Sequence, residues 1–88
     1  MFKDNPDQNR FEWLENGMVV FADYYPARDA LVIPHVEAPV ALRGTGAADR
    51  LMAALAAHAR DKELKLVPSC GYAAAWFRRH KDAQDVLA

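Results

Sequence analysis

The sequence has little of three things that would place it in a specialised class of proteins: cysteine, excess charge and long apolar runs. One cysteine among 88 residues excludes an internal disulfide, so a reducing compartment is the expected setting. The formal net charge of −1 argues against a nucleic-acid-binding surface, because such surfaces carry a basic excess. The longest apolar runs, such as residues 30–34, are far too short to cross a bilayer.

The beginning of the chain lacks the features of a secretory signal. Residues Met1–Asn9 are polar and include Asp4 and Asp7, whereas a signal has a basic start and then an apolar stretch. We therefore expect a cytoplasmic protein in which residues 1–9 form a flexible segment. The length, with an apolar fraction of 52% and no internal repeat, predicts a single globular domain over residues 1–88.

The first half of the chain predicts three strands. Phe11–Leu14 alternates weakly, and Asn16-Gly17 is a strong hairpin signal because both residues tolerate positive φ. Met18–Tyr24 is rich in β-branched and aromatic residues, as a partner strand should be. A second turn is expected over Tyr25–Asp29, which contains a proline.

The third strand is expected over Ala30–Glu37, with an interruption at Pro34. Proline has no amide to donate to a ladder, so Pro34 marks a strand edge or a bulge. Apolar residues then recur at helical spacing from Gly46 to about Lys62. A short strand over Leu64–Val67, a second helix over residues 72–80 and a weak helical turn at the C-terminus follow.

This order of elements, β-β-β-α-β-α, predicts an α+β fold, or α/β sandwich. The strand–helix–strand part should cross over with a right hand, which makes its two strands parallel.

The segment Val40–Leu51 is the most informative stretch of the chain. It places Arg43, Gly46 and Ala48 in the pattern Arg-x-x-Gly-x-Ala at the start of the long helix. The first amides of a helix have no intrahelical partner, and the helix dipole is positive there, so such a turn can bind phosphate. A plain tight connection is the alternative interpretation. The segment is neither a Walker loop nor a good dinucleotide fingerprint.

Three further features are candidates for chemistry. Cys70 lies just before the second helix, where a thiolate is stabilised, although an isolated cysteine can simply be a small buried side chain. His35 and Glu37 lie two apart on a strand and so share a face, either as a proton-relay pair or as a structural hydrogen bond. Arg79 and His80 form a basic cluster that meets either solvent or a phosphate, and Trp76 is most simply a core residue.

These motifs, taken together, resemble the short YjdJ-type branch of the GNAT acetyltransferase superfamily. There a His-x-Glu strand end leads into Pro-x-x-Leu-Arg-Gly-x-Gly, and here the chain has His35-Val36-Glu37-Ala38-Pro39 followed by Ala41-Leu42-Arg43-Gly44-Thr45-Gly46. The second half agrees through Leu66-Val67-Pro68, Cys70, Tyr72-Ala73-Ala74-Ala75-Trp76 and Arg79-His80. The resemblance covers about residues 10–80.

The resemblance implies a half-sized GNAT fold that binds acetyl-coenzyme A between two strands that splay apart. It implies that the pyrophosphate rests on amides of the glycine turn, and that the coenzyme contacts are Val36, Leu42, Arg43, Gly44, Thr45, Gly46, Ala47, Ala48, Tyr72, Trp76, Arg79 and His80. The implied activity is transfer of acetyl to an amine. Either Cys70 carries the acetyl group, or the amine attacks directly while His35 or Glu37 accepts a proton.

The chain departs from the family pattern at four places and in its length. Ala47 stands where isoleucine is frequent, and Pro34 precedes His35 where a polar or apolar strand residue is usual. Gly71 stands where the family has proline after the cysteine, and Lys81 replaces the proline of the usual His-Pro pair. Typical GNAT enzymes are nearly twice as long, so few residues remain to shape an acceptor pocket. An open site suits a protein amine as acceptor, in a monomer or a homodimer.

Two other functions are alternatives to an acetyltransferase: a coenzyme-A-binding module without turnover and a small interaction domain. No metal site is expected.

Overall fold

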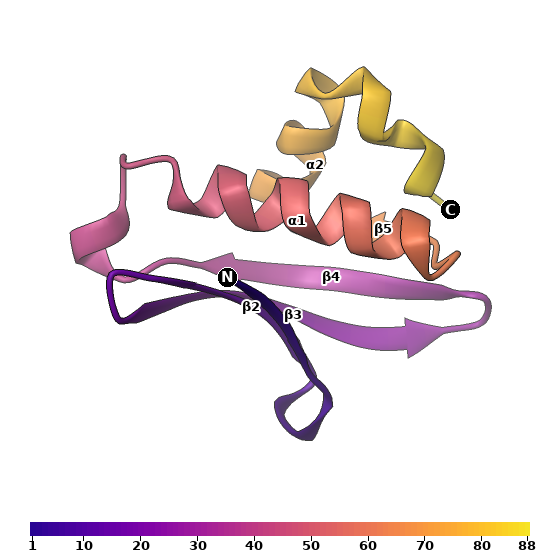
Figure 1. Ribbon diagram of the computed structural model, residues 1–88. Helices are drawn as coiled ribbons and strands as arrows, with labels where there is room; N and C mark the ends of the chain where they lie inside the picture. Colours follow the sequence, from indigo (N-terminus) through magenta and orange to yellow (C-terminus); the bar gives the residue numbers. More distant parts are fainter.

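Five strands form one mixed sheet in the computed structural model, which describes residues Met1–Ala88, and the helices cover one face of that sheet (Figure 1). Neighbouring strands are antiparallel except β4 and β5, which are parallel. The strands are β1 Phe2–Asn5, β2 Arg10–Glu15, β3 Met18–Ala27, β4 Ala30–Glu37 and β5 Leu66–Pro68. The helices are α1 Ala47–Asp61 and α2 Gly71–Arg79, with 3-10 segments at Pro6–Gln8 (η1), Val40–Leu42 (η2) and Lys81–Val86 (η3). The predicted α+β class is confirmed, with one extra strand at the N-terminus.

The first residues form an edge strand, and the expectation of a flexible segment over residues 1–9 is wrong. β1 pairs with β2 from Phe2 opposite Trp13 to Asn5 opposite Arg10. The Phe2 ring stacks on Phe11 at 5.8 Å between centroids. The strand contains one apolar residue, so its sequence carries no alternation. It is held by contacts to residues distant in the chain, which local patterns do not reveal.

The two hairpin turns use residues with positive φ. Asn16 and Gly17 have φ of 52° and 72°, which confirms the predicted hairpin between β2 and β3. The second turn is shorter than predicted: β3 continues through Pro26 to Ala27, and Arg28 turns the chain with φ of 57°. β2 pairs with β3 only as far as Asp23, so Pro26 lies where β3 has one neighbour and needs no second ladder bond.

The proline in β4 marks the predicted bulge. Asp23 pairs with His35 and Tyr25 pairs with Val32, so Tyr24 alone faces both Ile33 and Pro34. The parallel pairing with β5 also ends here, at Ile33 opposite Pro68. Beyond this point β4 and β5 separate, and residues 35–37 have a strand neighbour on one side only.

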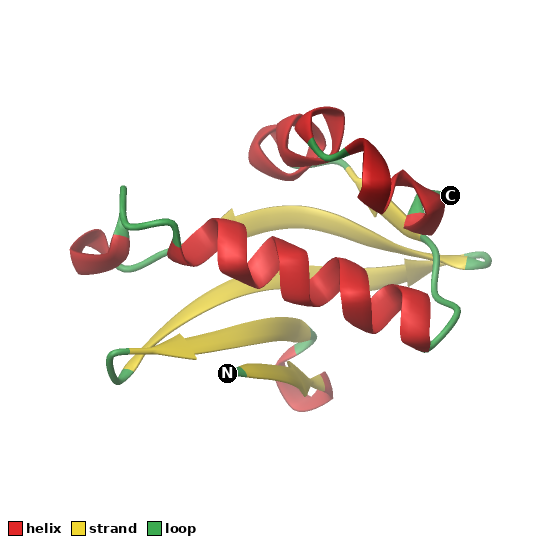
Figure 2. Cartoon of the chain, turned by 45° about the horizontal axis from the view of Figure 1, so that its top comes forward, coloured by secondary structure: helices red, strands yellow, loops and turns green.

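The core lies between the sheet and the three elements α1, α2 and η3, which lie on the same face of it (Figure 2). α1 runs across the sheet and α2 packs beside it near β4 and β5 (Figure 1). The largest fully buried side chains are Phe11, Val20, Ile33, Leu51, Met52, Leu55, Leu66, Phe77 and Val86. The opposite face of the sheet has no helix against it. None of the helices has the length and apolar character needed to cross a membrane.

Candidate functional site

The glycine turn leads from η2 into α1 with two glycines in the left-handed region. Gly44 has φ of 78°, and Gly46, the N-cap of α1, has φ of 90°. Thr45 stabilises the turn from inside, because its hydroxyl donates to the Leu42 carbonyl and accepts from the Ala47 amide at 3.3 Å. The predicted turn before a helix is therefore confirmed in its geometry.

Four amides of this turn have no acceptor within the chain. The Thr45 amide bonds to the Leu42 carbonyl and the Arg50 amide to the Gly46 carbonyl, but the amides of Gly44, Gly46, Ala48 and Asp49 bond to nothing. They lie at the positive end of the dipole of a 15-residue helix. Unpaired donors in this position are the usual elements of an anion site.

A cleft connects the turn to the free end of β4. It consists of two adjoining hollows of about 330 and 310 Å³, which share Ala38, Arg43, Ala48 and Tyr72. The first hollow is completed by the turn, with Leu42, Gly44, Gly46 and Asp49. The second is completed by the β4 residues His35, Val36 and Glu37. The cleft thus runs between the C-terminal end of β4, where β4 has separated from β5, and the starts of α1 and α2.

Arg43 supplies the positive side chain of the cleft. Its Nε donates to the Ala38 carbonyl at 3.1 Å, which fixes the side chain along the cleft while the guanidinium stays exposed. The planar guanidinium can bind a phosphate through two hydrogen bonds.

His35 and Glu37 form the predicted pair. His35 Nε2 lies 2.9 Å from Glu37 Oε1, and both side chains are about half exposed, at 50% and 52%. By strand alternation they lie on the uncovered face of the sheet, opposite Asp23 and Phe21. Both residues also line the second hollow, so the pair lies at the rim of the cleft.

Cys70 and Tyr72 lie at the start of α2. Of these two residues, Tyr72 lines the cleft and Cys70 does not. Cys70 is the half-buried N-cap of α2, and its amide donates to the Ile33 carbonyl at 3.1 Å. Burial raises the pKa of Tyr72, and the negative charge of Asp49 adds to this effect. The Tyr72 phenol therefore stays protonated and has an O–H available to donate.

Five expected coenzyme contacts do not line the cleft. Two of them belong to the turn itself: Thr45, whose hydroxyl bonds within the turn, and Ala47, which is fully buried. The other three lie on or beside α2. Trp76 is 2% exposed, and its Nε1 donates to Asp49 Oδ1 at 2.6 Å. The His80 ring stacks on Trp76 with 3.9 Å between centroids. Arg79 is exposed beside them on α2. Of the expected coenzyme contacts, most therefore line the cleft, whereas Trp76 and His80 form a cluster behind the start of α1.

Sequence reasoning missed Arg50, which fixes the turn to the β2–β3 hairpin. Its guanidinium binds Glu15 through two bonds of 2.8 and 2.6 Å, and its Nη2 also donates to the Thr45 carbonyl at 3.2 Å. Arg50, with help from Trp13, lowers the pKa of Glu15 to about 2. The partners are 35 residues apart, so no local signal could have indicated the pair.

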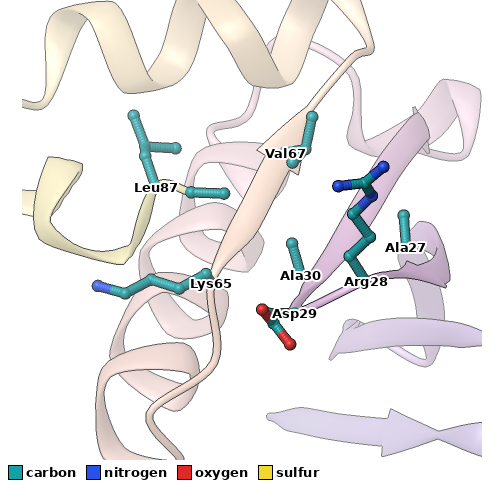
Figure 3. A pocket seen from close by; sticks show the side chains of 8 residues that line it. Ala27, Arg28, Asp29, Ala30, Lys65, Val67 and Leu87 are labelled. Carbon is teal, nitrogen blue, oxygen red and sulfur yellow. The ribbon is translucent and has the colours of Figure 1, made fainter.

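A larger hollow of about 460 Å³ lies elsewhere, between the β3–β4 turn, β5 and the C-terminus (Figure 3). Arg28 and Asp29 come from the turn, and Leu87 comes from the end of the chain (Figure 3). Val67 lies in β5, and Lys65 is the residue just before this strand (Figure 3). It contains no residue of the glycine turn and none of the predicted site. Its size alone gives it no chemistry.

Comparison with known proteins gives the family to which the chain belongs. Residues 10–86 match the family model of GCN5-related N-acetyl-transferases. The chain belongs to this family. The solution NMR structure of a GCN5-like protein from Staphylococcus aureus has a TM-score of 0.68 and 25% sequence identity, over 100% of this chain and 87% of that one. No curated protein matches the sequence. The GNAT fold predicted from the motifs is thereby confirmed.

Proposed function

We propose that this GNAT protein is an N-acetyltransferase of the short YjdJ-type branch that transfers acetyl from acetyl-coenzyme A to an amine. The observation that carries the proposal is the continuity of the cleft. Four unpaired amides at the start of α1 lead directly to a strand edge that lacks a neighbour and then to the His35–Glu37 pair.

The residues present fit the coenzyme. The amides of Gly44, Gly46 and Ala48, with the Arg43 guanidinium, would hold the pyrophosphate. The unpaired edge of β4 around Val36 would hold the extended pantetheine arm through backbone hydrogen bonds. Asp49 is the one opposing charge in this part of the cleft, and its carboxylate is bonded to Trp76. When bound, acetyl-coenzyme A supplies an acetyl group activated as a thioester.

The side chains around the second hollow include groups that can accept a proton and a group that can donate a hydrogen bond. An amine that forms a C–N bond as the thioester C–S bond breaks must lose a proton, and Glu37 or His35 at the rim of the second hollow would accept it. Tyr72, whose phenol stays protonated, can donate toward a developing negative charge. Cys70 lies two residues away, half-buried, and acetyl transfer through its sulfur is the second route.

One observation favours a second candidate function, a coenzyme-A-binding module without turnover. The His35–Glu37 pair lies on a sheet face that no helix covers, so nothing in the chain walls in an acceptor. An open face is compatible with a protein amine as acceptor, and equally with a partner that docks without receiving acetyl.

The binding step is tested by isothermal titration of coenzyme A into the wild type and Ala48→Glu. Ala48 lines both hollows at the second position of α1, where a carboxylate stabilises the helix but repels phosphate. We expect roughly tenfold or greater loss of affinity. The matched control is Ala57→Glu, the same change at an exposed position of α1, which should bind as the wild type does. Absence of binding by the wild type at millimolar coenzyme A would reject both candidate functions.

The two candidates are separated by mass spectrometry after incubation with acetyl-coenzyme A and a lysine peptide. Acetyl transfer that is lost in Glu37→Gln but kept in Cys70→Ala supports direct attack. Acetyl retained on Cys70, with turnover lost in Cys70→Ala, supports the covalent route. Binding without transfer, and with hydrolysis at the uncatalysed rate, identifies a binding module.

A further inference from the structure

We infer that Trp76 and His80 are positioning residues that hold the Asp49 carboxylate away from the amides of its own helix and so keep the anion site open. The inference rests on the proposed coenzyme binding, because it explains how that site stays available. It gives a role to two of the residues that were expected to contact coenzyme but lie outside the cleft.

Asp49 is an acidic residue at the position most able to block the site. With Gly46 as N-cap, Asp49 is the third residue of α1. An acidic or amide side chain at this position commonly folds back onto the N-cap amide, which satisfies a free donor and gains from the helix dipole. Here the Gly46 amide has no acceptor, so this fold-back bond is absent.

The carboxylate is instead bound from behind by α2. Trp76 Nε1 donates to Asp49 Oδ1 at 2.6 Å from a side chain that is 2% exposed. A buried indole has one rigid donor, so it can hold an acceptor in a fixed direction. Asp49 itself remains 55% exposed and would otherwise be free to move.

His80 fixes the indole that holds Asp49. Its ring is stacked on Trp76 with an angle of 11° between the planes. Nδ1 lies 2.7 Å from the Trp76 carbonyl, which can only accept, so the proton of this bond is on Nδ1. Nε2 lies 3.6 Å from Asp49 Oδ1, beyond hydrogen-bond distance, so His80 acts on the carboxylate through the indole.

The inference is tested by a double-mutant cycle with Trp76→Phe and Asp49→Ala, measured by titration with coenzyme A. Trp76→Phe keeps a ring in the core and removes the donor, so the carboxylate is released and affinity should fall about fivefold. Trp76→Phe with Asp49→Ala should regain at least wild-type affinity, because no carboxylate remains to compete. A loss that persists in the double variant would mean that Trp76 acts through packing, and would overturn the inference.

Asp49→Ala alone keeps the test decisive even if Trp76→Phe does not fold, since Asp49 is a half-exposed helix position. Because Asp49 lines the first hollow, its removal should raise affinity even when the carboxylate is held away, but by less than about fivefold. A gain clearly above that bound would show that the carboxylate already covers the amides, and would also overturn the inference.

A readout on the free protein separates this inference from the proposed function. In ¹⁵N NMR spectra without ligand, Trp76→Phe should shift the Gly46 amide, and adding Asp49→Ala should reverse that shift. Failure of the wild type to bind coenzyme A would reject the proposed function while leaving this shift intact. An unchanged chemical shift of the Gly46 amide in Trp76→Phe would reject the inference that Trp76 holds Asp49, and would leave the proposed function untouched.

Discussion

Gly46 is the residue on which the geometry of the turn most depends. Its φ of 90° is strained for any residue with a Cβ, and a Cβ built there would lie 2.9 Å from Arg50 Nη1. The same arginine binds Glu15 and the Thr45 carbonyl, so a displaced side chain would loosen the link between α1 and the hairpin. Backbone strain and a side-chain clash therefore act in the same direction.

We predict that Gly46→Ala lowers the free energy of unfolding by about 1–2 kcal/mol, measured by urea denaturation. Gly71→Ala is the matched control, because Gly71 begins α2 without a positive φ and an added Cβ meets nothing. It should leave stability unchanged or raise it slightly, as alanine favours helix. Equal losses in the two variants would show that the turn conformation of Gly46 is not the cause.

At the scale of elements, α1 ends in an arrangement that usually contains glycine. The Leu64 amide donates to the Ala59 carbonyl at 2.8 Å and the Glu63 amide to the Arg60 carbonyl at 3.3 Å, which is a Schellman motif. Glu63 occupies its left-handed position with φ of 57°. The sequence predicts the end of this helix near Lys62 but shows no glycine cap, because the motif is formed here by a strained residue.

Glu63→Gly should therefore stabilise the protein by about 0.5–1 kcal/mol, since relief of the strain exceeds the added flexibility of the unfolded chain. Thermal or urea unfolding measures the change. Glu63→Ala removes the same carboxylate but keeps a Cβ, and should bring no gain. A stabilisation by alanine as large as that by glycine would assign the effect to charge.

The elements differ in how far the sequence could predict them. The β2–β3 hairpin and both helices follow from local signals, namely Asn16-Gly17 and apolar spacing of three to four residues. β1 and the extension of β3 through Pro26 could not be predicted, because each depends on which strand lies beside it. The same limit applies to the site: the turn and His35–Glu37 are local in sequence, whereas Asp49–Trp76 joins residues 27 apart.

For the whole molecule, three carboxylates bound to cations connect stability to pH. Hydrogen bonds from Asn5 and Arg10 lower the pKa of Glu12, Arg50 and Trp13 lower that of Glu15 to about 2, and Arg60 lowers that of Asp85. A group with a lowered pKa binds its proton more weakly in the folded state. For Glu15, this stabilisation is complete above the ordinary pKa of 4.5 and disappears as pH falls toward 2.

We predict that the free energy of unfolding decreases as pH falls from about 4.5 to about 2, and that Glu15→Gln makes this decrease less steep. Urea denaturation at a series of pH values measures both. Glu63→Gln, at an exposed residue whose side chain makes no hydrogen bond, should leave the slope as in the wild type. A slope that Glu15→Gln does not change would mean that other carboxylates cause the acid sensitivity.

The sequence by itself determined the features whose cause is local. Positive-φ residues define the hairpin and the glycine turn, the bulge follows from a proline without an amide, and the order of motifs indicates the GNAT family. The tertiary structure alone decided which groups meet. It separates β4 from β5, turns His35 and Glu37 to the uncovered face, and places Trp76 behind Asp49 rather than in the cleft. Such contacts depend on packing between segments that are far apart in the chain, so the spacing of residues along the sequence does not predict them.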